Sequence, residues 1–271
     1  MAQDTVFYQK IKRIFDRNAS PLVMGILNIT PDSFFDGGKY TTEQAWFEQT
    51  RQMIDDGADL IDIGAYSSRP GAKDISEQEE SERLIPAVLS VRKAFPDVLI
   101  SVDTFRAAIA EKAVASGANI INDISGGTID ENMFSVVAKL DVPYVLMHIQ
   151  GTPQTMQIDP QYKDVVSEVS FYFSEKLEIL KKLGVKRVIL DPGFGFGKTV
   201  EHNLKLLENL KEFERFGCPI LVGISNKSFV SKILNYKEFS VIIGTSVLNK
   251  MALQNGAKVL RVHNVKEAKE L

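Results

Sequence analysis

The sequence predicts an α/β fold, a single (β/α)8 TIM barrel that follows a short N-terminal extension. The first observation is a set of short apolar runs without polar alternation, a pattern typical of parallel strands buried on both faces. The second is that segments with helical periodicity separate most of these runs, which indicates parallel pairing. The third is their number, because eight runs favour a closed barrel, which has no edge strands, over an open sheet.

The apolar runs define the expected strands and the extent of the barrel. Residues 1–20 precede the first run, and we expect this extension to cover the floor of the barrel. Residues 21–271 are then one domain, of a length that suits such a barrel. In chain order the runs are Leu22–Leu27, Leu60–Gly64, Val98–Val102, Asn119–Ile121, Pro143–Met147, Arg187–Leu190, Pro219–Val222 and Lys258–Val262.

The segments between the runs carry helix signals. Before the third run, apolar residues recur at i, i+4, i+7 and i+11 over Leu84–Phe95, and Ser76 with Glu79 has the pattern of a capping box. A second apolar stripe runs over Val166–Leu180, and Gly184 follows it as a helix terminator.

Composition sets limits on partners and location. A net charge of −3 gives no reason to expect nucleic acid or an anionic membrane as a partner. The single cysteine, Cys218, excludes an intrachain disulfide. Met1–Lys10 lacks the apolar core of a signal peptide, and no apolar stretch has the length of a membrane span. We therefore expect a cytoplasmic protein.

Polar residues gather directly after the runs, where (β/α)8 barrels carry their chemistry. Three of these segments are long: residues 28–38 (NITPDSFFDGG), residues 64–71 (GAYSSRPG) and residues 191–198 (DPGFGFGK). The remaining strand ends contribute Asp103, Thr104, Asn122, Asp123, His148, residues 225–228 (SNKS), Arg261 and His263. Each motif alone is common, whereas their joint order and placement are specific.

In this order the motifs resemble the dihydropteroate synthase family, and the resemblance covers Pro21 to about Glu267. It implies a transferase of folate biosynthesis and a sulfonamide target. Such an enzyme joins 6-hydroxymethyl-7,8-dihydropterin diphosphate to p-aminobenzoate, giving 7,8-dihydropteroate and diphosphate. It also implies Mg²⁺ as cofactor and a homodimer formed through the last helices.

The resemblance assigns pterin binding to Asp103, Asn122, Asp191 and Lys227. The chemistry fits, because a buried pterin needs acceptors for its N–H groups, which would otherwise go unpaired at about 1–3 kcal/mol each. Lys227 can donate to the acceptors of the ring and offset the charge of the carboxylates. Any one of these residues alone would also fit a cap or a solvated strand end.

The resemblance assigns diphosphate binding to Asn28, Ser68, Arg261 and His263, with Asn28 also meeting Mg²⁺. Arg261 and His263 lie two apart on a strand, so their side chains point to the same side. Cations and oriented donors are what a diphosphate leaving group requires. His263 alone would also fit a surface histidine.

For p-aminobenzoate, the resemblance suggests an apolar slot with polar groups at its ends. The residues are Phe34, Arg69, Pro70, Phe196 and Ser228, with Lys227 nearby. Both phenylalanines would equally fit a packing role. The glycine-containing loops after the first two runs, 28–38 and 64–71, are expected to act as lids that order around the substrates.

The catalytic residues implied by the resemblance are Asp103, Lys227, Asp36 and Arg261. The family's reaction is similar to an SN1 displacement: diphosphate leaves first, nearby carboxylates stabilise the methylene cation, and the arylamine attacks. No side-chain nucleophile is needed. His148 is interpreted as a hydrogen-bonded structural histidine, with an approach to the diphosphate as the alternative.

Three features depart from the family pattern. Asn226 stands where arginine is usual before Lys227, Asn264 stands where an acid usually follows His263, and residues 234–244 are several residues shorter. The loss of a positive charge at Asn226 is expected to reduce rate or affinity. These departures leave open a non-catalytic pterin-binding homologue. A pterin-dependent methyltransferase domain, which resembles this fold and shares its Asp and Asn pterin contacts, is a further alternative, although it needs neither a diphosphate site nor the loops Asn28–Gly38 and Ser67–Gly71.

Overall fold

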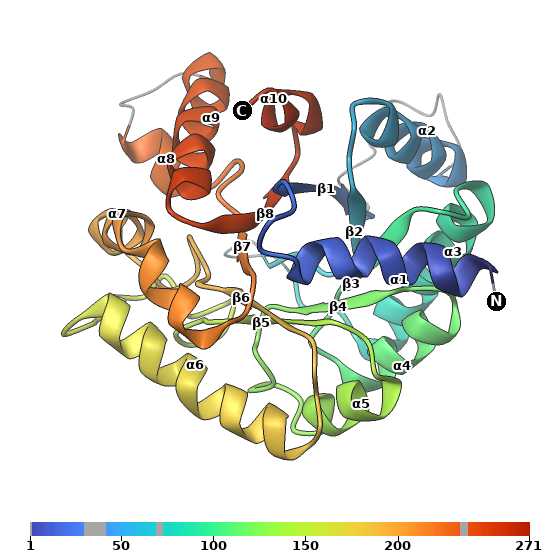
Figure 1. The fold of residues 1–271 in the computed structure, drawn as a ribbon, viewed down its shortest axis with the longest axis horizontal. Coiled ribbons are helices and arrows are strands. Elements are labelled where there is room, and N and C mark those ends of the chain that lie inside the picture. Colours follow the sequence, from blue (N-terminus) through green and yellow to red (C-terminus); the bar gives the residue numbers. More distant parts are fainter. Residues whose placement is uncertain (1, 30–41, 69–72, 234–237) are drawn as a thin grey trace.

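The computed structural model describes residues 2–29, 42–68, 73–233 and 238–271. Its strands pair in parallel and in chain order, and β8 closes the ring on β1 (Figure 1). The predicted (β/α)8 barrel is confirmed, and every strand lies within one or two residues of a predicted run. The strands are β1 Leu22–Asn28, β2 Leu60–Gly64, β3 Leu99–Asp103, β4 Ile120–Asp123, β5 Tyr144–Met147, β6 Val188–Asp191, β7 Ile220–Val222 and β8 Ala257–Val262.

Helices surround the barrel (Figure 1). As predicted, the Oγ atom of Ser76 accepts a hydrogen bond from the backbone N–H of Glu79 at 3.1 Å, which starts α3. Gly184, at φ +83°, follows the end of α6. The helices are α1 Ala2–Phe15, α2 Thr42–Asp55, α3 Glu77–Ala94, α4 Ala107–Ala115, α5 Met133–Leu140, α6 Val165–Lys182, α7 Val200–Glu208, the 3-10 helix η2 Leu210–Phe216, α8 Ser228–Ile233, α9 Glu238–Gln254 and α10 Val265–Lys269.

Alternate residues of each strand enter two separate apolar clusters. On β2, Ile61 and Ile63 pack outward against the surrounding helices, whereas Leu60 belongs to the inner cluster of the barrel. This alternation follows from the two-residue period of a strand. Asp62 and Gly64 therefore share the inward side with Leu60.

The helix α1 packs against the inner cluster from one end. Ile14 is 1% exposed and belongs to that cluster together with the first inward residues of the strands, and the partly buried Phe7 and Ile11 pack beside it. The Nζ atom of Lys258 donates to the backbone oxygen of Asp16 at 2.7 Å. In Figure 1, α1 crosses in front of the strands. None of the helices in the described ranges is long and apolar enough to cross a membrane.

Candidate active site

A row of register partners crosses the first four strands at their C-terminal ends. Asn28 pairs with Gly64, Gly64 with Asp103, and Asp103 with Asn122. Partners in a parallel register present their side chains on the same side of the sheet. A Cβ atom on Gly64 would lie 3.3 Å from the Cβ of Asp103, so glycine leaves room for that carboxylate. Three of the predicted site residues therefore line one edge of the barrel mouth.

Arg261 joins residues that were predicted to serve different substrates. Its Nη2 atom donates to Asp103 Oδ2 at 2.9 Å, and its Nε atom donates to Asp62 Oδ2 at 2.7 Å. The same oxygen of Asp62 accepts a hydrogen bond from Asn122 Nδ2 at 3.0 Å. A predicted diphosphate residue and two predicted pterin residues thus share one buried network.

Asp62 was missed by sequence reasoning. It lies inside the second apolar run, where only its charge distinguishes it from its neighbours, and it is fully buried. The available signal was a carboxylate on the inward side of a strand otherwise made of apolar residues and glycine, because a buried charge requires a partner.

Burial controls the protonation of the groups around the mouth. Burial raises the pKa of Asp103 to about 7, although the charge of Arg261 opposes the shift. Burial also raises the pKa of Asp191, and lowers that of Lys227 to about 8 with a further contribution from Arg261. Acids and amines with pKa values moved toward neutrality are typical of functional sites.

The loop after β6 lies at the opposite side of the mouth. Asp191 Oδ1 accepts a hydrogen bond from the backbone N–H of Gly193 at 2.8 Å. Gly193 has φ +72°, and a Cβ atom there would lie 1.9 Å from the backbone oxygen of His148, so only glycine fits. The Nζ atom of Lys227 lies 3.9 Å from the centre of the Phe196 ring, which joins a predicted pterin residue to a predicted p-aminobenzoate residue.

Beneath this loop, Lys198 and His148 form a buried pair. Lys198 Nζ lies 3.0 Å from His148 Nδ1 and donates to the backbone oxygen of Phe196 at 3.0 Å. Burial lowers the pKa of Lys198 to about 7, and it lowers that of His148 well below its ordinary value. These contacts agree with the structural interpretation of His148. They also identify Lys198, for which no role was predicted, as the support of the loop.

The remaining predicted residues lie at the ends of β1, β2, β7 and β8. The Nδ1 atom of His263 lies 3.0 Å from Ser225 Oγ. Asn28 ends β1, Ser68 follows β2, and Ser228 begins α8. Within the described part of the chain, no hydrogen bond joins the side chain of Ser68 or Ser228 to another predicted site residue. The predictions for Phe34, Asp36, Arg69 and Pro70 fall outside the described residues, as do most of the predicted lid 28–38, the end of the predicted lid 64–71 and the start of the shortened stretch 234–244.

The described residues contain no group of three or more acidic, histidine or cysteine side chains that could hold a metal ion. Asn28 offers one amide oxygen at the mouth, beside the row that carries Asp103. A hard ion such as Mg²⁺ prefers oxygen ligands and often keeps several waters while it binds substrate phosphates. The donor set fits an ion that arrives with a diphosphate better than one that the protein alone would hold.

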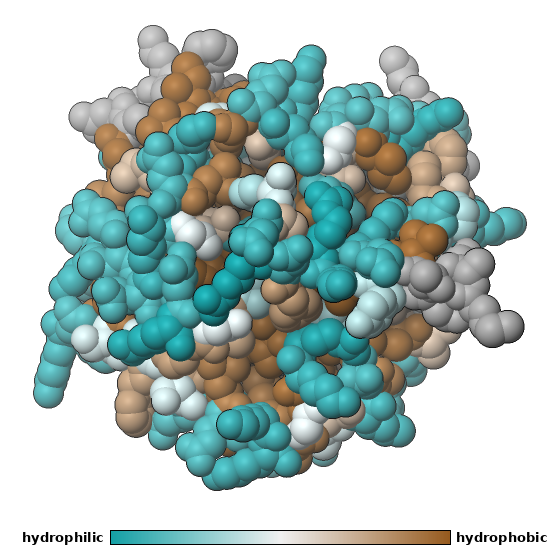
Figure 2. Space-filling model, viewed as in Figure 1, coloured by the Kyte–Doolittle hydropathy of each residue, from teal (hydrophilic) through white to brown (hydrophobic). Residues whose placement is uncertain are grey.

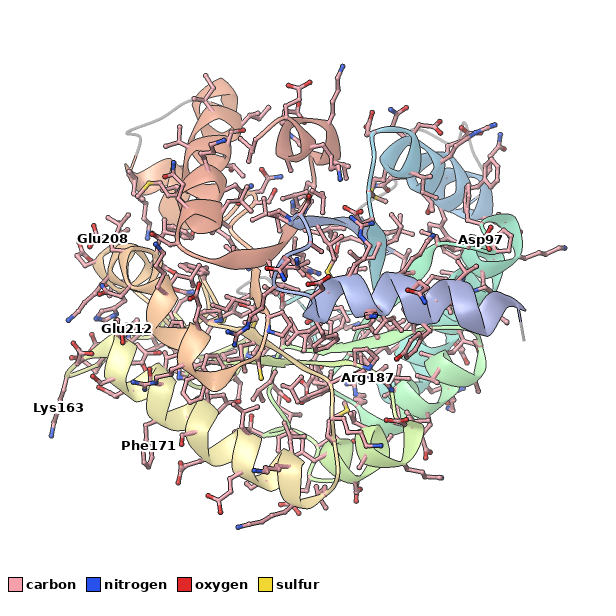
Figure 3. All side chains as sticks on the ribbon, in the orientation of Figure 1. Asp97, Lys163, Phe171, Arg187, Glu208 and Glu212 are labelled. Carbon is pink, nitrogen blue, oxygen red and sulfur yellow. The ribbon has the colours of Figure 1, made fainter. Side chains whose placement is uncertain are left out.

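Two hollows lie along α6, away from this network. One, of about 600 Å³, is lined by His148, Tyr162 and Glu168, among others, and a second, of about 670 Å³, by Lys205 and other residues. Phe171 borders both and points from α6 away from the molecule (Figure 3). Both hollows are open and neither contains the Asp103–Arg261 contact, so the candidate site remains at the barrel mouth.

Comparisons with known proteins agree with this geometry. The model of a family described as pterin binding enzyme matches residues 24–263. The chain is 44% identical to the dihydropteroate synthase of Synechocystis over 255 residues, which cover 93% of this chain and 88% of that protein. It is 42% identical to the dihydropteroate synthase of Escherichia coli over 252 residues, which cover 92% of this chain and 89% of that protein.

Solved structures give the same result. The Yersinia pestis dihydropteroate synthase in complex with a sulfonamide drug superposes with a TM-score of 0.87 at 42% identity, covering 94% of this chain and 92% of that one. The Xanthomonas albilineans dihydropteroate synthase in complex with 7,8-dihydropteroate superposes with a TM-score of 0.84 at 34% identity, covering 94% and 92%.

Proposed function

The chain belongs to the family of pterin-binding enzymes and, within it, to the dihydropteroate synthases, and we propose that it catalyses the reaction of that enzyme. It condenses 6-hydroxymethyl-7,8-dihydropterin diphosphate with p-aminobenzoate and releases 7,8-dihydropteroate and diphosphate, a step of folate biosynthesis. The observation that carries the proposal is the contact between Asp103 and Arg261, 2.9 Å apart at the mouth of a (β/α)8 barrel. It joins an acceptor for the heterocycle to a cation for its leaving group.

The pterin lies between Asp103, Asn122, Asp191 and Lys227 in this proposal. Two carboxylates and one amide supply acceptors for the N–H groups of the ring, and Lys227 supplies a donor. Asn122 is 3% exposed and Asp191 is 6% exposed, so a ligand that meets them leaves water. Unpaired groups would then cost free energy, which gives the site its selectivity for a ring with matching donors.

Diphosphate departs toward Arg261 and His263, with Asn28 and Ser68 as additional contacts. The two bonds to carboxylates use two of the five N–H donors of Arg261. Its other three donors have no hydrogen-bond partner among the described residues, so they can meet phosphate oxygens. Asn28 would also contribute an oxygen to Mg²⁺, which, when bound, would offset negative charge on the diphosphate.

The chemical step breaks the bond between the pterin methylene carbon and the diphosphate oxygen. The positive charge left on the carbon is delocalised into the ring, where Asp103 and Asp36 stabilise it electrostatically. The amine of p-aminobenzoate then attacks the carbon and loses a proton. Phe196 and Ser228 contribute to the slot for this arylamine, together with Phe34, Arg69 and Pro70.

The protein works as a homodimer in this proposal, with α9 in the interface. Ile242, Ile243 and Val247 on α9 are 38%, 51% and 53% exposed, and exposed apolar residues grouped on one helix are typical of a protein–protein interface. Hydrophobic surface gathers over α9 at the upper left of Figure 2. We place the enzyme in the cytoplasm, and we assign residues 1–20 to an N-terminal extension and residues 21–271 to the pterin-binding barrel.

A turnover assay tests the function. With p-aminobenzoate and Mg²⁺ present, the purified chain is expected to release diphosphate from the pterin substrate and to form dihydropteroate, which mass spectrometry detects. Pterin binding without turnover would support a non-catalytic homologue instead. Asp103→Asn is expected to bind pterin more weakly, whereas Asp55→Asn, exposed at the end of α2, serves as a carboxylate control and should bind pterin as the wild type does.

A further inference from the structure

Asp62 is a buried carboxylate at the centre of the network to which the family resemblance gives no role. It lies in the middle of β2, on the inward side that Leu60 and Gly64 share, and it is fully buried. Leu60 beneath it packs in the inner apolar cluster, and Gly64 above it belongs to the row with Asp103. Asp62 is therefore one layer below the residues that line the mouth.

One oxygen atom of Asp62 serves both halves of the site. Oδ2 accepts hydrogen bonds from Arg261 Nε at 2.7 Å and from Asn122 Nδ2 at 3.0 Å. Oδ1 has no hydrogen-bond partner within the described part of the chain. The charge of the carboxylate is offset by Arg261, which in turn lies between Asp62 and Asp103.

The bond to Asn122 decides which way that amide faces. An ionised carboxylate only accepts hydrogen bonds, so it must meet the NH2 group of Asn122 and not its carbonyl oxygen. The Oδ1 atom of Asn122 is thereby turned away from Asp62 and left to accept from a ligand. Without Asp62, the amide could turn over and present two donors to the donors of a pterin ring.

We propose that Asp62 is a positioning residue of the pterin site: it fixes the carbonyl oxygen of Asn122 as an acceptor and holds the Arg261 guanidinium against Asp103. The inference rests on the proposed function for the identity of the ring. The ligand class follows from the chemistry, since the site favours a heterocycle that offers N–H donors to Asn122. The same carboxylate makes the geometry of the heterocycle site and the diphosphate site depend on each other.

The test begins with Asp62→Asn and binding measurements that need no turnover. Isothermal titration with 6-hydroxymethylpterin is expected to show affinity weakened about tenfold, because the Asn122 amide is no longer held in one orientation. Ser101→Ala is the matched control. Ser101 pairs with Asp62 in the register of β2 and β3, is equally buried, and its Oγ atom has no partner among the described residues. Its affinity is expected to stay within about twofold of wild type.

Inorganic diphosphate with Mg²⁺ tests the second half of the proposal. Asp62→Asn removes a negative charge beside Arg261, so an effect of charge alone would tighten diphosphate binding. Loss of positioning weakens it instead, and we expect binding weakened severalfold. Tighter diphosphate binding by Asp62→Asn would overturn the role assigned through Arg261.

A reciprocal exchange separates positioning from general destabilisation. In the double variant Asp62→Asn, Asn122→Asp, the amide on β2 donates a hydrogen bond to the carboxylate on β4. The second oxygen of that carboxylate stays free to accept a hydrogen bond from the ligand. We expect pterin affinity to recover at least in part relative to Asp62→Asn. If Asp62→Asn does not fold, the double variant carries the test alone and must still bind the pterin.

Besides tighter diphosphate binding, two results on pterin affinity would overturn the proposal. One is wild-type pterin affinity in folded Asp62→Asn, and the other is a folded double variant that binds pterin no better than the single variant. A wild-type chain that bound pterin without making product would count against the proposed function only, because the affinity comparison decides the role of Asp62 independently.

Discussion

Along four strands, the inward side chain changes from apolar at the floor of the barrel to polar two residues farther toward its mouth. The floor positions belong to one apolar cluster with Ile14 of α1. The mouth positions include the network around Arg261. The floor residues and the polar residues two positions farther along each strand are Leu60 and Asp62, Ile120 and Asn122, Ile189 and Asp191, and Val259 and Arg261; Asp62 lies one layer below the mouth itself.

The difference shows how one set of strands serves stability and chemistry separately. Contacts at the floor are non-directional, so each apolar side chain contributes through its own burial and packing. At the mouth each charged group depends on a specific partner, because a buried charge without one is costly. Substitutions at the floor should therefore change stability and leave the reaction intact, whereas those at the mouth should change both.

The largest effect is expected for Arg261→Met at the mouth. The variant leaves Asp62 and Asp103 without their shared cation and removes donors for the departing diphosphate. We expect kcat/KM to fall about 10³-fold and the free energy of unfolding to fall by about 3 kcal/mol. Steady-state kinetics and urea unfolding measure the two losses. Arg261→Lys is the control, since it keeps the charge but cannot donate to Asp62 and Asp103 from two fixed N–H groups. It should recover only part of the kcat/KM and part of the free energy of unfolding.

At the floor, Ile14→Ala should separate stability from activity. Ile14 is 1% exposed, so its truncation is expected to cost about 2–4 kcal/mol of unfolding free energy. The kcat/KM of the folded fraction should stay at the wild-type value. Tyr8→Ala on the same helix is the control, because Tyr8 is 59% exposed and its loss should change stability by less than about 0.5 kcal/mol. A drop in kcat/KM for Ile14→Ala would break the distinction between floor and mouth.

The same contrast explains what the sequence could predict. The strands were found because apolar runs and helical stripes are local patterns, and their ends were in error by no more than two residues. The strand-end position of Asp103, Asn122, Asp191 and Arg261 followed from the barrel itself. Which groups touch did not follow, because the contact between Arg261 and Asp103 joins β8 to β3 and depends on the closed geometry.

Two further features needed the structure for different reasons. Asp62 was missed because it lies inside an apolar run. Its position there indicates a residue of the apolar core, and nothing local in the sequence indicates that it belongs to a polar network. Lys198 lies in a glycine-rich segment in which only Asp191 and Phe196 were given roles. Its buried contact with His148 joins residues 50 positions apart and leaves no local sequence pattern. The substrate assigned to each site residue remains a prediction, and Phe34, Asp36, Arg69 and Pro70 in addition lie outside the described ranges.

The protonation of Asp103 gives the mouth a pH dependence that the floor lacks. Because burial raises the pKa of Asp103 to about 7, its carboxylate becomes protonated and loses its negative charge as the pH falls through that value. We expect the kcat/KM for the pterin substrate to fall about tenfold per pH unit below it. The diphosphate group also titrates near this range, so Asp103→Asn is the reference. Its profile should be lower and flatter, and two parallel profiles would contradict the assignment.

Lys198 predicts a smaller pH effect, on stability. Burial lowers the pKa of its amine from 10.5 to about 7 in the folded protein. Between these values the unfolded chain holds the proton and the folded chain does not, so the free energy of unfolding should rise with pH. Relative to Lys198→Met, the wild type should gain about 1–2 kcal/mol between pH 7 and pH 9. Urea unfolding at both pH values measures this gain. If the difference in unfolding free energy between wild type and Lys198→Met were the same at pH 7 and pH 9, the prediction would be wrong.

The smallest effect is expected at Asn226, where backbone conformation and charge compete. Asn226 is exposed and has φ +56°, a left-handed conformation that asparagine adopts more readily than arginine does. Asn226→Arg should therefore lower the free energy of unfolding by about 0.5–1 kcal/mol, while its charge lowers the KM for p-aminobenzoate severalfold. Asn226→Gly is the control, because it removes the strain without adding charge and should leave the KM unchanged. If Asn226→Arg lowered stability but left the KM for p-aminobenzoate unchanged, the usual arginine would be dispensable for the reaction here. Backbone strain at the mouth would then affect stability without affecting substrate binding.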